Sequence, residues 1–374
     1  MMTGGQRKNS DIECMRAVAI ILVMMQHFRA RLPTPSFYYG MFDHIQPWTG
    51  VDLFLAISGY LVCKTLLEHL DHEPLRVALT NFWLRRAVRL LPAFAFWAAV
   101  SVIVASIVSD VPTSGFVDAS KGALVGLIGI ANIYWTLCAQ HGFTCVKFDY
   151  NSHFWSLALE WQLYVFLAVS VAAFGARGAL VLFAVVAFVA SLFPAPSFSW
   201  AWSLRPQAFF LGSLIYVALR RRRFFLFAES TRIIALRRAI FLLGILTVIV
   251  SPVAVGEPFI IPMVGIGAAM ALLSTLGAKA IVPRSLSGIL GWIGARSYSI
   301  YLCHLSVIYG LRKVLLATLH FTNPAPVAFF AGSWVVLIVV TFAAADLSYR
   351  FIELPAIGWF RQRSGKASKV STVA

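Results

Sequence analysis

Long uncharged apolar runs constrain the fold of this chain more than any other feature. Three of them are Gly178–Pro194, Ala239–Val253 and Val327–Ala345. A helix needs about 20 apolar residues to cross a bilayer, so these runs are long enough, or nearly so. Only 12% of the residues are charged and 60% are hydrophobic, which is unlike a soluble chain. We predict an all-α fold, a polytopic integral membrane helical bundle.

Eleven apolar segments are candidate membrane spans. They lie at 12–31, 48–67, 90–109, 121–138, 154–174, 178–194, 203–219, 237–254, 258–277, 297–316 and 326–350. The basic loops and both termini can share one side only if the number of crossings between them is even. We therefore predict about ten transmembrane helices with both termini cytoplasmic, and one candidate within 121–174 that is short or re-entrant.

The net charge of +16 could indicate a nucleic-acid partner. The basic residues, however, cluster in segments that we interpret as loops: Arg85, Arg86 and Arg89; Arg220–Arg223 with Arg232, Arg237 and Arg238; and Arg361, Arg363, Lys366 and Lys369. This is the positive-inside distribution of a membrane protein. The sequence therefore indicates a lipid bilayer as partner and no nucleic acid.

The chain is predicted to hold one membrane domain, residues 1–355, followed by a basic, disordered cytoplasmic tail at 356–374 that is too short to fold alone. Its cysteines have no metal-ligand spacing, so we predict no metal site. Three are expected to be buried thiols, and Cys138 and Cys145 flank a loop that a disulfide could close in an oxidising compartment.

Arg16 and His27 are ionisable residues inside the first apolar segment. Eleven residues at about 100° each bring a helix back to the same face, about 16 Å further along its axis. Ionisable groups within a membrane usually have a function. The pair predicts a path along this helix face that leads from a charged ligand near Arg16 to a site of chemistry near His27.

The segment Asn81–Pro92 carries Arg85, Arg86 and Arg89 among aromatic and aliphatic residues. It is either an interfacial anchor with snorkelling arginines or a docking site for an anionic cofactor, since arginines bind phosphates bidentately.

Ser156 and Glu160 are four residues apart and share one helix face. A carboxylate inside a span must pair across helices or stay protonated. Glu160 is therefore a partner for Arg16, or an acid, base or orienting group beside His27.

Polar stripes also occur in the last two spans. Ser297, Tyr301 and His304 follow the helical repeat and serve either interhelical hydrogen bonding or chemistry. The charges of Asp346–Glu353 follow the same repeat, and we expect them to pair internally.

The second span begins with Gly50–Tyr60 (GVDLFLAISGY). Asp52 is expected to anchor the end of this span or to orient His27. Ser58–Gly59 predicts a close contact between two helices through small residues.

The order of these motifs resembles the membrane acyltransferase-3 family from Arg16 to Pro355. The matching segments are R-x10-H, GVDLF…SGY, RRAVRLLP, HFWSLALE, RPQAFFLG, LGWIGARSYSIYLCH and SYRFIELP. The resemblance implies an enzyme of the bacterial inner membrane that moves an acyl group, usually acetyl from acetyl-CoA, to hydroxyls of cell-surface or secreted carbohydrates. Acyl-CoA is then the donor substrate, with no permanently bound cofactor.

The resemblance also implies residue roles. His27 would be the catalytic base, and Arg16 and Glu160 would belong to the same catalytic site. Arg85, Arg86 and Arg89 would hold the CoA phosphates. The other signature positions are Asp52, Ser58, Trp155, Ser156, Tyr301 and His304.

Two other classes of protein would use the same polar residues. A proton-coupled transporter of a carbohydrate or lipid-linked glycan would use them as a proton relay. A non-catalytic assembly protein would use them as interhelical contacts. The three arginines of Asn81–Pro92 separate these classes, because an enzyme that uses CoA needs them for binding and a transporter needs them mainly for topology.

Overall fold

The computed structural model describes residues 9–142, 149–221, 230–277, 279–360 and 362, and these ranges contain helices and no strands. The all-α prediction is confirmed for this part of the chain. The elements are α1 (Ser10–Phe28), α2 (Ser36–Met41), a 3-10 turn (Pro47–Thr49), α3 (Gly50–Leu70), α4 (Leu75–Val108), α5 (Pro112–Leu127), α6 (Ala131–Gln140), α7 (Phe154–Ala190), α8 (Trp200–Ser203), α9 (Gln207–Arg221), α10 (Thr231–Ala254), α11 (Ile260–Thr275), α12 (Arg284–Ala295), α13 (Ser297–Leu319), α14 (Val327–Ser348) and a π-helical turn (Tyr349–Glu353).

Six helices in the described ranges are long and apolar enough to cross a membrane: α3, α4, α7, α10, α13 and α14. Helix α11 is apolar but shorter. The chain is therefore a membrane protein, and a total of ten crossings stays a prediction.

Two predicted span boundaries change in the structure. The range 121–138 is not one span, because the chain turns between α5 and α6 at Gly129, whose φ is 77°. The range 154–174 and the first part of the range 178–194 lie within α7, which ends at Ala190, on either side of Gly175, whose φ of 65° interrupts the helix. Glycine adopts this left-handed backbone without the steric cost of a Cβ atom. The range 121–138 thus falls on the end of α5 and on most of α6, which has 10 residues, and a re-entrant segment stays a prediction.

The arginines of Asn81–Pro92 do not lie in a loop, which corrects the sequence prediction. They lie inside α4, a helix of 34 residues that continues through Pro92. A proline removes one backbone donor and often kinks a helix, but here it does not end α4. The arginines therefore lie in the interior of α4, more than two helical turns from its first residue.

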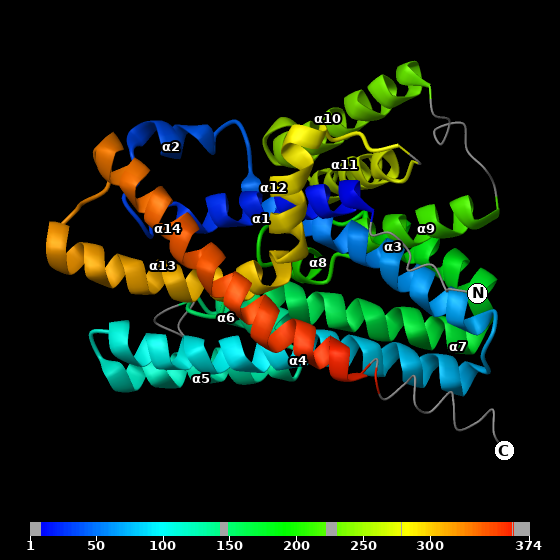
Figure 1. The fold of residues 1–374 in the computed structure, drawn as a ribbon, viewed down its shortest axis with the longest axis horizontal. Helices are drawn as coiled ribbons and strands as arrows, with labels where there is room; N and C mark the ends of the chain where they lie inside the picture. Colours follow the sequence, from blue (N-terminus) through cyan, green and yellow to red (C-terminus); the bar gives the residue numbers. More distant parts are fainter. Residues whose placement is uncertain (1–8, 143–148, 222–229, 278, 361, 363–374) are drawn as a thin grey trace.

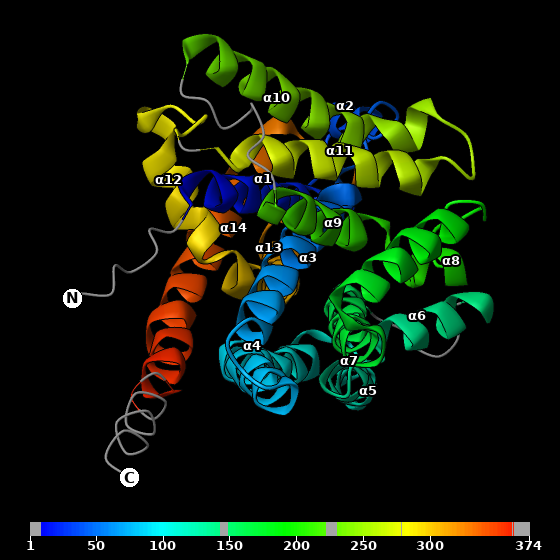
Figure 2. The ribbon, with the colours of Figure 1, turned by 90° about the vertical axis from the view of Figure 1, so that its right-hand side faces the viewer.

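Helices α4, α5 and α7 run along the horizontal axis of Figure 1 and are seen nearly end-on in Figure 2, whereas α10 and α11 cross them and are seen lengthwise in Figure 2. The start of α1, the connection between α3 and α4, and the end of α9 lie toward one end, and α2 and the connection between α13 and α14 lie toward the other. Helix α1 is central: Figure 2 shows it below α10 and α11 and above the group of α4, α5 and α7, and it contacts α3, α11, α12 and α13. His27 is thus at the opposite end of α1 from the start of the chain.

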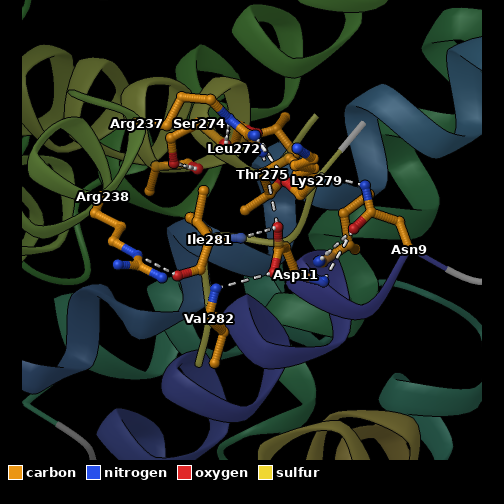
Figure 3. Close-up of polar contacts among 12 residues, drawn as sticks. Asn9, Asp11, Arg237, Arg238, Leu272, Ser274, Thr275, Lys279, Ile281 and Val282 are labelled. Atoms are coloured by element: carbon orange, nitrogen blue, oxygen red, sulfur yellow. Dashed lines mark hydrogen bonds and ion pairs between the residues drawn. The ribbon is translucent and has the colours of Figure 1, made fainter. Parts of the chain in front are cut away.

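Polar contacts fix the first turn of α1 to the segment after α11 (Figure 3). The Asp11 carboxylate accepts hydrogen bonds from the backbone amides of Ile281 and Val282, at 2.9 and 3.3 Å. Arg237 of α10 lies 3.7 Å from Asp11 and donates to the backbone oxygens of residues 274 and 279. Asn9 caps α1 and donates to the Thr275 carbonyl at 2.9 Å. These bonds fix the axial position of α1.

The cysteine predictions are confirmed where the structure describes them. Cys14, Cys63 and Cys303 are buried and free, and Cys138 is disulfide-bonded. Cys145 lies outside the described residues, as do Arg222, Arg223, Arg361 and the chain from residue 363 onward. The first residues of the predicted tail, 356–360, are helical rather than disordered.

Close packing of α3 against α9 confirms the small-residue contact predicted at Ser58–Gly59. A Cβ atom at Gly59 would lie 1.9 Å from the carbonyl oxygen of Phe209, and one at Gly212 would lie 2.1 Å from the carbonyl oxygen of Ala56. The two backbones therefore touch at reciprocal glycines.

We predict that Gly59→Ala forces α3 and α9 apart and lowers the stability by about 1–3 kcal/mol, the usual cost of overpacking. The measurement is the melting temperature of the purified protein in detergent. Gly310→Ala in α13 is the matched control, because a Cβ atom there has no neighbour within 4 Å and alanine favours a helix. Equal melting temperatures for the two variants would contradict the close contact.

Candidate active site

Two cavities lie along the bundle beside α1. The aromatic cavity, of about 480 Å³, is lined by His27, Trp48, Trp135, Trp155, Trp202 and Tyr301, with Arg31, Asp149 and Ser152 also in its wall. The arginine cavity, of about 80 Å³, is lined by Arg16, Arg86, Arg89, Ser58, Ser156, Glu160 and Tyr301. Arg16 and His27 share one face of α1 as predicted, and each belongs to a different cavity.

His27 forms a hydrogen-bonded pair with His304 of α13. The His27 Nδ1 atom lies 3.0 Å from His304 Nε2, and His304 Nδ1 lies 2.6 Å from the carbonyl oxygen of Tyr301. A carbonyl can only accept, so we assign the proton of neutral His304 to Nδ1, and its Nε2 must then accept from His27. His27 is therefore protonated on Nδ1 and has its lone pair on Nε2, the tautomer that a general base needs.

Arg86 and Arg89 lie on the face of α4 that lines the arginine cavity, whereas Arg85 is exposed and is not among the lining residues. The structure thus brings two of the three predicted phosphate ligands together with Arg16. Within the described part of the chain, neither Arg86 nor Arg89 has a carboxylate at ion-pair distance, although the Arg86 guanidinium lies 5.3 Å from the Tyr164 ring centre. Partly buried guanidinium groups without a counterion favour an anionic ligand.

Glu160 is held by hydroxyl groups. Its carboxylate accepts hydrogen bonds from Ser58 of α3 and from Tyr164, one turn further along α7. The ion pair of Arg16 is formed with Glu13, at 3.6 Å. Of the two alternatives for Glu160, the structure thus does not form the direct ion pair with Arg16: Arg16 pairs with Glu13, and both hydroxyls bind the Oε1 atom of Glu160.

Asp52 forms a buried ion pair with Arg205, a residue that the sequence interpretation did not single out. Both carboxylate oxygens accept from the guanidinium, at 3.0 and 3.1 Å, and both side chains are almost fully buried. Asp52 therefore orients Arg205 and not His27. The pair joins residues 153 positions apart, and the only sequence signal for it is the motif RPQAFFLG.

Arg205 in turn supports the aromatic cavity. Its guanidinium carbon lies 4.4 Å from the Trp202 ring centre, 4.8 Å from Trp155 and 5.3 Å from Trp48. Cation–π attraction is strong where the cation is shielded from water. The Asp52–Arg205 pair thus positions three of the tryptophans that line the aromatic cavity, including the predicted signature residue Trp155.

The remaining predicted stripe, Asp346–Glu353, forms structural contacts. Asp346 pairs with Arg350 at 2.8 Å and with Arg296 at 2.5 Å, and Glu353 accepts a hydrogen bond from Ser299. The prediction of internal charge pairing is confirmed for Asp346 and Arg350, and this stripe does not line either cavity.

In the wall of the aromatic cavity, Asp149 accepts hydrogen bonds from Arg31 and from the Tyr309 hydroxyl. Burial acts to raise the pKa of the Asp149 carboxyl, but the Arg31 charge and these hydrogen bonds outweigh it and hold this pKa below the ordinary value of 3.8. Asp149 is therefore an anion at neutral pH. Neither Arg31 nor Asp149 lies in a recognisable sequence motif, so the sequence analysis did not identify this pair.

His27 of α1 thus lines the aromatic cavity, and Arg16 of the same helix lines the arginine cavity. A family model described as an acyltransferase domain, Acyl_transf_3, matches residues 9–345. The chain belongs to the acyltransferase-3 family, which confirms the resemblance.

Relatives of the chain include O-acetyltransferase OatA of Staphylococcus aureus strain NCTC 8325 / PS 47, which is 25% identical over 385 residues, covering 92% of this chain and 56% of OatA. OatA of strain COL has the same identity and the same coverage. The protein SACOL0978 of strain COL is 27% identical over 158 residues, which cover 42% of this chain and 24% of SACOL0978. The chain spans about half the length of OatA. No solved structure matches it.

The contribution of Asp149 to stability is predicted to depend on pH. Because its folded-state pKa is lowered, the stabilisation is fully present above the ordinary value of 3.8 and is lost as the pH falls through the lowered pKa. The measurement is the difference in melting temperature between the wild type and Asp149→Asn. We expect a constant difference from pH 5 to 7 that shrinks below about pH 4. A difference that grows on acidification would contradict the assignment.

Proposed function

We propose that the protein is a membrane O-acyltransferase that moves an acyl group, acetyl in the first instance, from acyl-CoA to a hydroxyl of a cell-surface or secreted carbohydrate. The observation that carries the proposal is the position of His27. Its imidazole faces the aromatic cavity, its tautomer is fixed by His304, and the arginine cavity lies behind it along the same face of α1.

The arginine cavity suits the donor. Arg86 and Arg89 provide forked donors for phosphate oxygens, and Arg16 continues the positive surface toward His27. The position of these arginines on a cavity wall, rather than in a loop, favours binding over topology and so favours an enzyme over a transporter. Acyl-CoA is made in the cytoplasm, so we place this end of the bundle and both termini there, in a bacterial inner membrane.

The aromatic cavity suits a carbohydrate acceptor. Tryptophan rings offer large apolar faces with a polar edge, which match the C–H faces and hydroxyl rim of a sugar ring. Arg31, Asp149 and Ser152 add hydrogen-bonding groups at the same wall. A mostly apolar cavity with a few polar groups is the usual form of a small-molecule site. The name of the relative OatA, an O-acetyltransferase, supports acetyl as the transferred group.

In the proposed reaction, His27 Nε2 takes the proton of the acceptor hydroxyl as its oxygen attacks the thioester carbonyl. The new C–O ester bond forms, the C–S bond breaks, and the proton passes from His27 to the departing sulfur to give free CoA thiol. The His304 hydrogen bond holds the ring in place while it carries the positive charge.

We predict that His27→Ala reduces the release of CoA thiol from acetyl-CoA by about 10²–10⁴-fold, the usual contribution of a general base. The measurement is thiol detection with the purified protein in detergent. His44→Ala, at an exposed histidine outside both cavities, is the matched control and should retain wild-type rates. Equal thiol release by the wild type and His27→Ala would overturn the catalytic role.

We also predict that Arg86→Lys weakens the binding of CoA, because lysine cannot reproduce the bidentate contact with a phosphate. Arg85→Lys makes the same chemical change at the neighbouring exposed arginine and should bind CoA as the wild type does. Calorimetry in detergent measures both affinities. If the two variants bind CoA equally well, the arginine cavity is not the phosphate site.

A further inference from the structure

Tyr301 separates the two cavities. Of the described residues, only Val51 and Tyr301 line both the arginine cavity and the aromatic cavity. Tyr301 is the larger of the two, and only 5% of its surface is exposed. An acyl group that passes from the arginine cavity to the aromatic cavity therefore comes close to this side chain.

Hydrogen bonds at its tip hold the Tyr301 side chain across this boundary. The hydroxyl donates to the carbonyl oxygen of His153 at 2.6 Å, and it lies 2.6 Å from Ser156 Oγ. Since the single tyrosine hydrogen goes to a carbonyl, the Ser156 hydroxyl must donate to the tyrosine oxygen. Both partners are fixed at the start of α7.

The ring is also held along its length. Its centre lies 6.4 Å from the Phe54 ring in an edge-to-face arrangement and 5.4 Å from the His153 ring. A buried ring with contacts on its sides and hydrogen bonds at its tip is a rigid wall rather than a flexible side chain.

We propose that Tyr301 is the residue that determines which acyl groups the enzyme transfers. The proposal rests on the donor site proposed above. A short acyl group such as acetyl fits between the thioester and this wall with its carbonyl beside His27. Each added methylene meets the ring or its Ser156 contact, and a fixed pocket discriminates one methylene by about tenfold or more.

The backbone of the same residue has a separate task, because the Tyr301 carbonyl accepts the His304 Nδ1 hydrogen bond that fixes the tautomer of His27. Substitution of the side chain leaves that carbonyl in place. Changes in acyl-length preference can therefore be separated from changes in the base.

The test is calorimetric binding of unreactive thioether analogues, S-ethyl-, S-butyl- and S-hexyl-CoA, to the full chain in detergent. The wild type should bind S-ethyl-CoA at least about tenfold more tightly than S-butyl-CoA. Tyr301→Ala should reduce this ratio to about twofold or less, and Tyr301→Phe, which retains the ring, should keep it. Tyr301→Leu, whose side chain fills more of the space than alanine does, should reduce this ratio by a smaller amount. It replaces Tyr301→Ala in the test if the alanine variant does not fold.

Tyr349→Ala is the matched control, because it removes a partly buried tyrosine that lines neither cavity, and it should keep the wild-type ratio. A wild type without length preference, or a Tyr301→Ala or Tyr301→Leu variant with an unchanged ratio, would overturn the role of Tyr301. Failure of the wild type to bind S-ethyl-CoA at all would instead contradict the proposed donor, so the two proposals fail in different ways.

Discussion

The hydrogen bonds of Asn9 to the last residue of α11 and of Asp11 to the segment after it fix the helix on which the rest of the site depends. Helix α1 contributes Arg16 to one cavity and His27 to the other, so a displacement along its axis would move both at once. A charged carboxylate is costly to bury unless it is well paired and hydrogen-bonded. Two backbone amides and Arg237 satisfy Asp11, and this requirement selects one axial position for α1.

The same physical requirement organises the neighbouring helices. Asp52 and Arg205 satisfy each other between α3 and the start of α9, and the glycines of those helices allow the backbones to touch. The buried pair then holds a group of tryptophans around the guanidinium. Electrostatic pairing in a low-dielectric interior and aromatic packing therefore act together to shape the cavity that faces His27.

Features set by one helix were predictable from the sequence, whereas the partners that distant helices bring to each other were not. The spacing of Arg16 and His27 and the shared face of Ser156 and Glu160 follow from the helical repeat alone. The Asp52–Arg205 pair and the Arg31–Asp149 pair join segments more than 100 residues apart, so no local pattern reveals them. The error at Asn81–Pro92 has a related cause, because arginines are typical of loops between membrane helices, whereas here they lie inside α4 and two of them line a cavity that other helices complete.

The histidine pair also restricts what happens to charge during turnover. His304 already gives its only hydrogen to a backbone oxygen, which cannot pass a proton onward. A proton taken up by His27 therefore has no onward path through His304, and in the proposed chemistry it leaves on the sulfur of the departing CoA. In the proposed chemistry no net charge is then left on the histidine pair at the end of a turnover, because the proton that His27 takes up leaves with the sulfur.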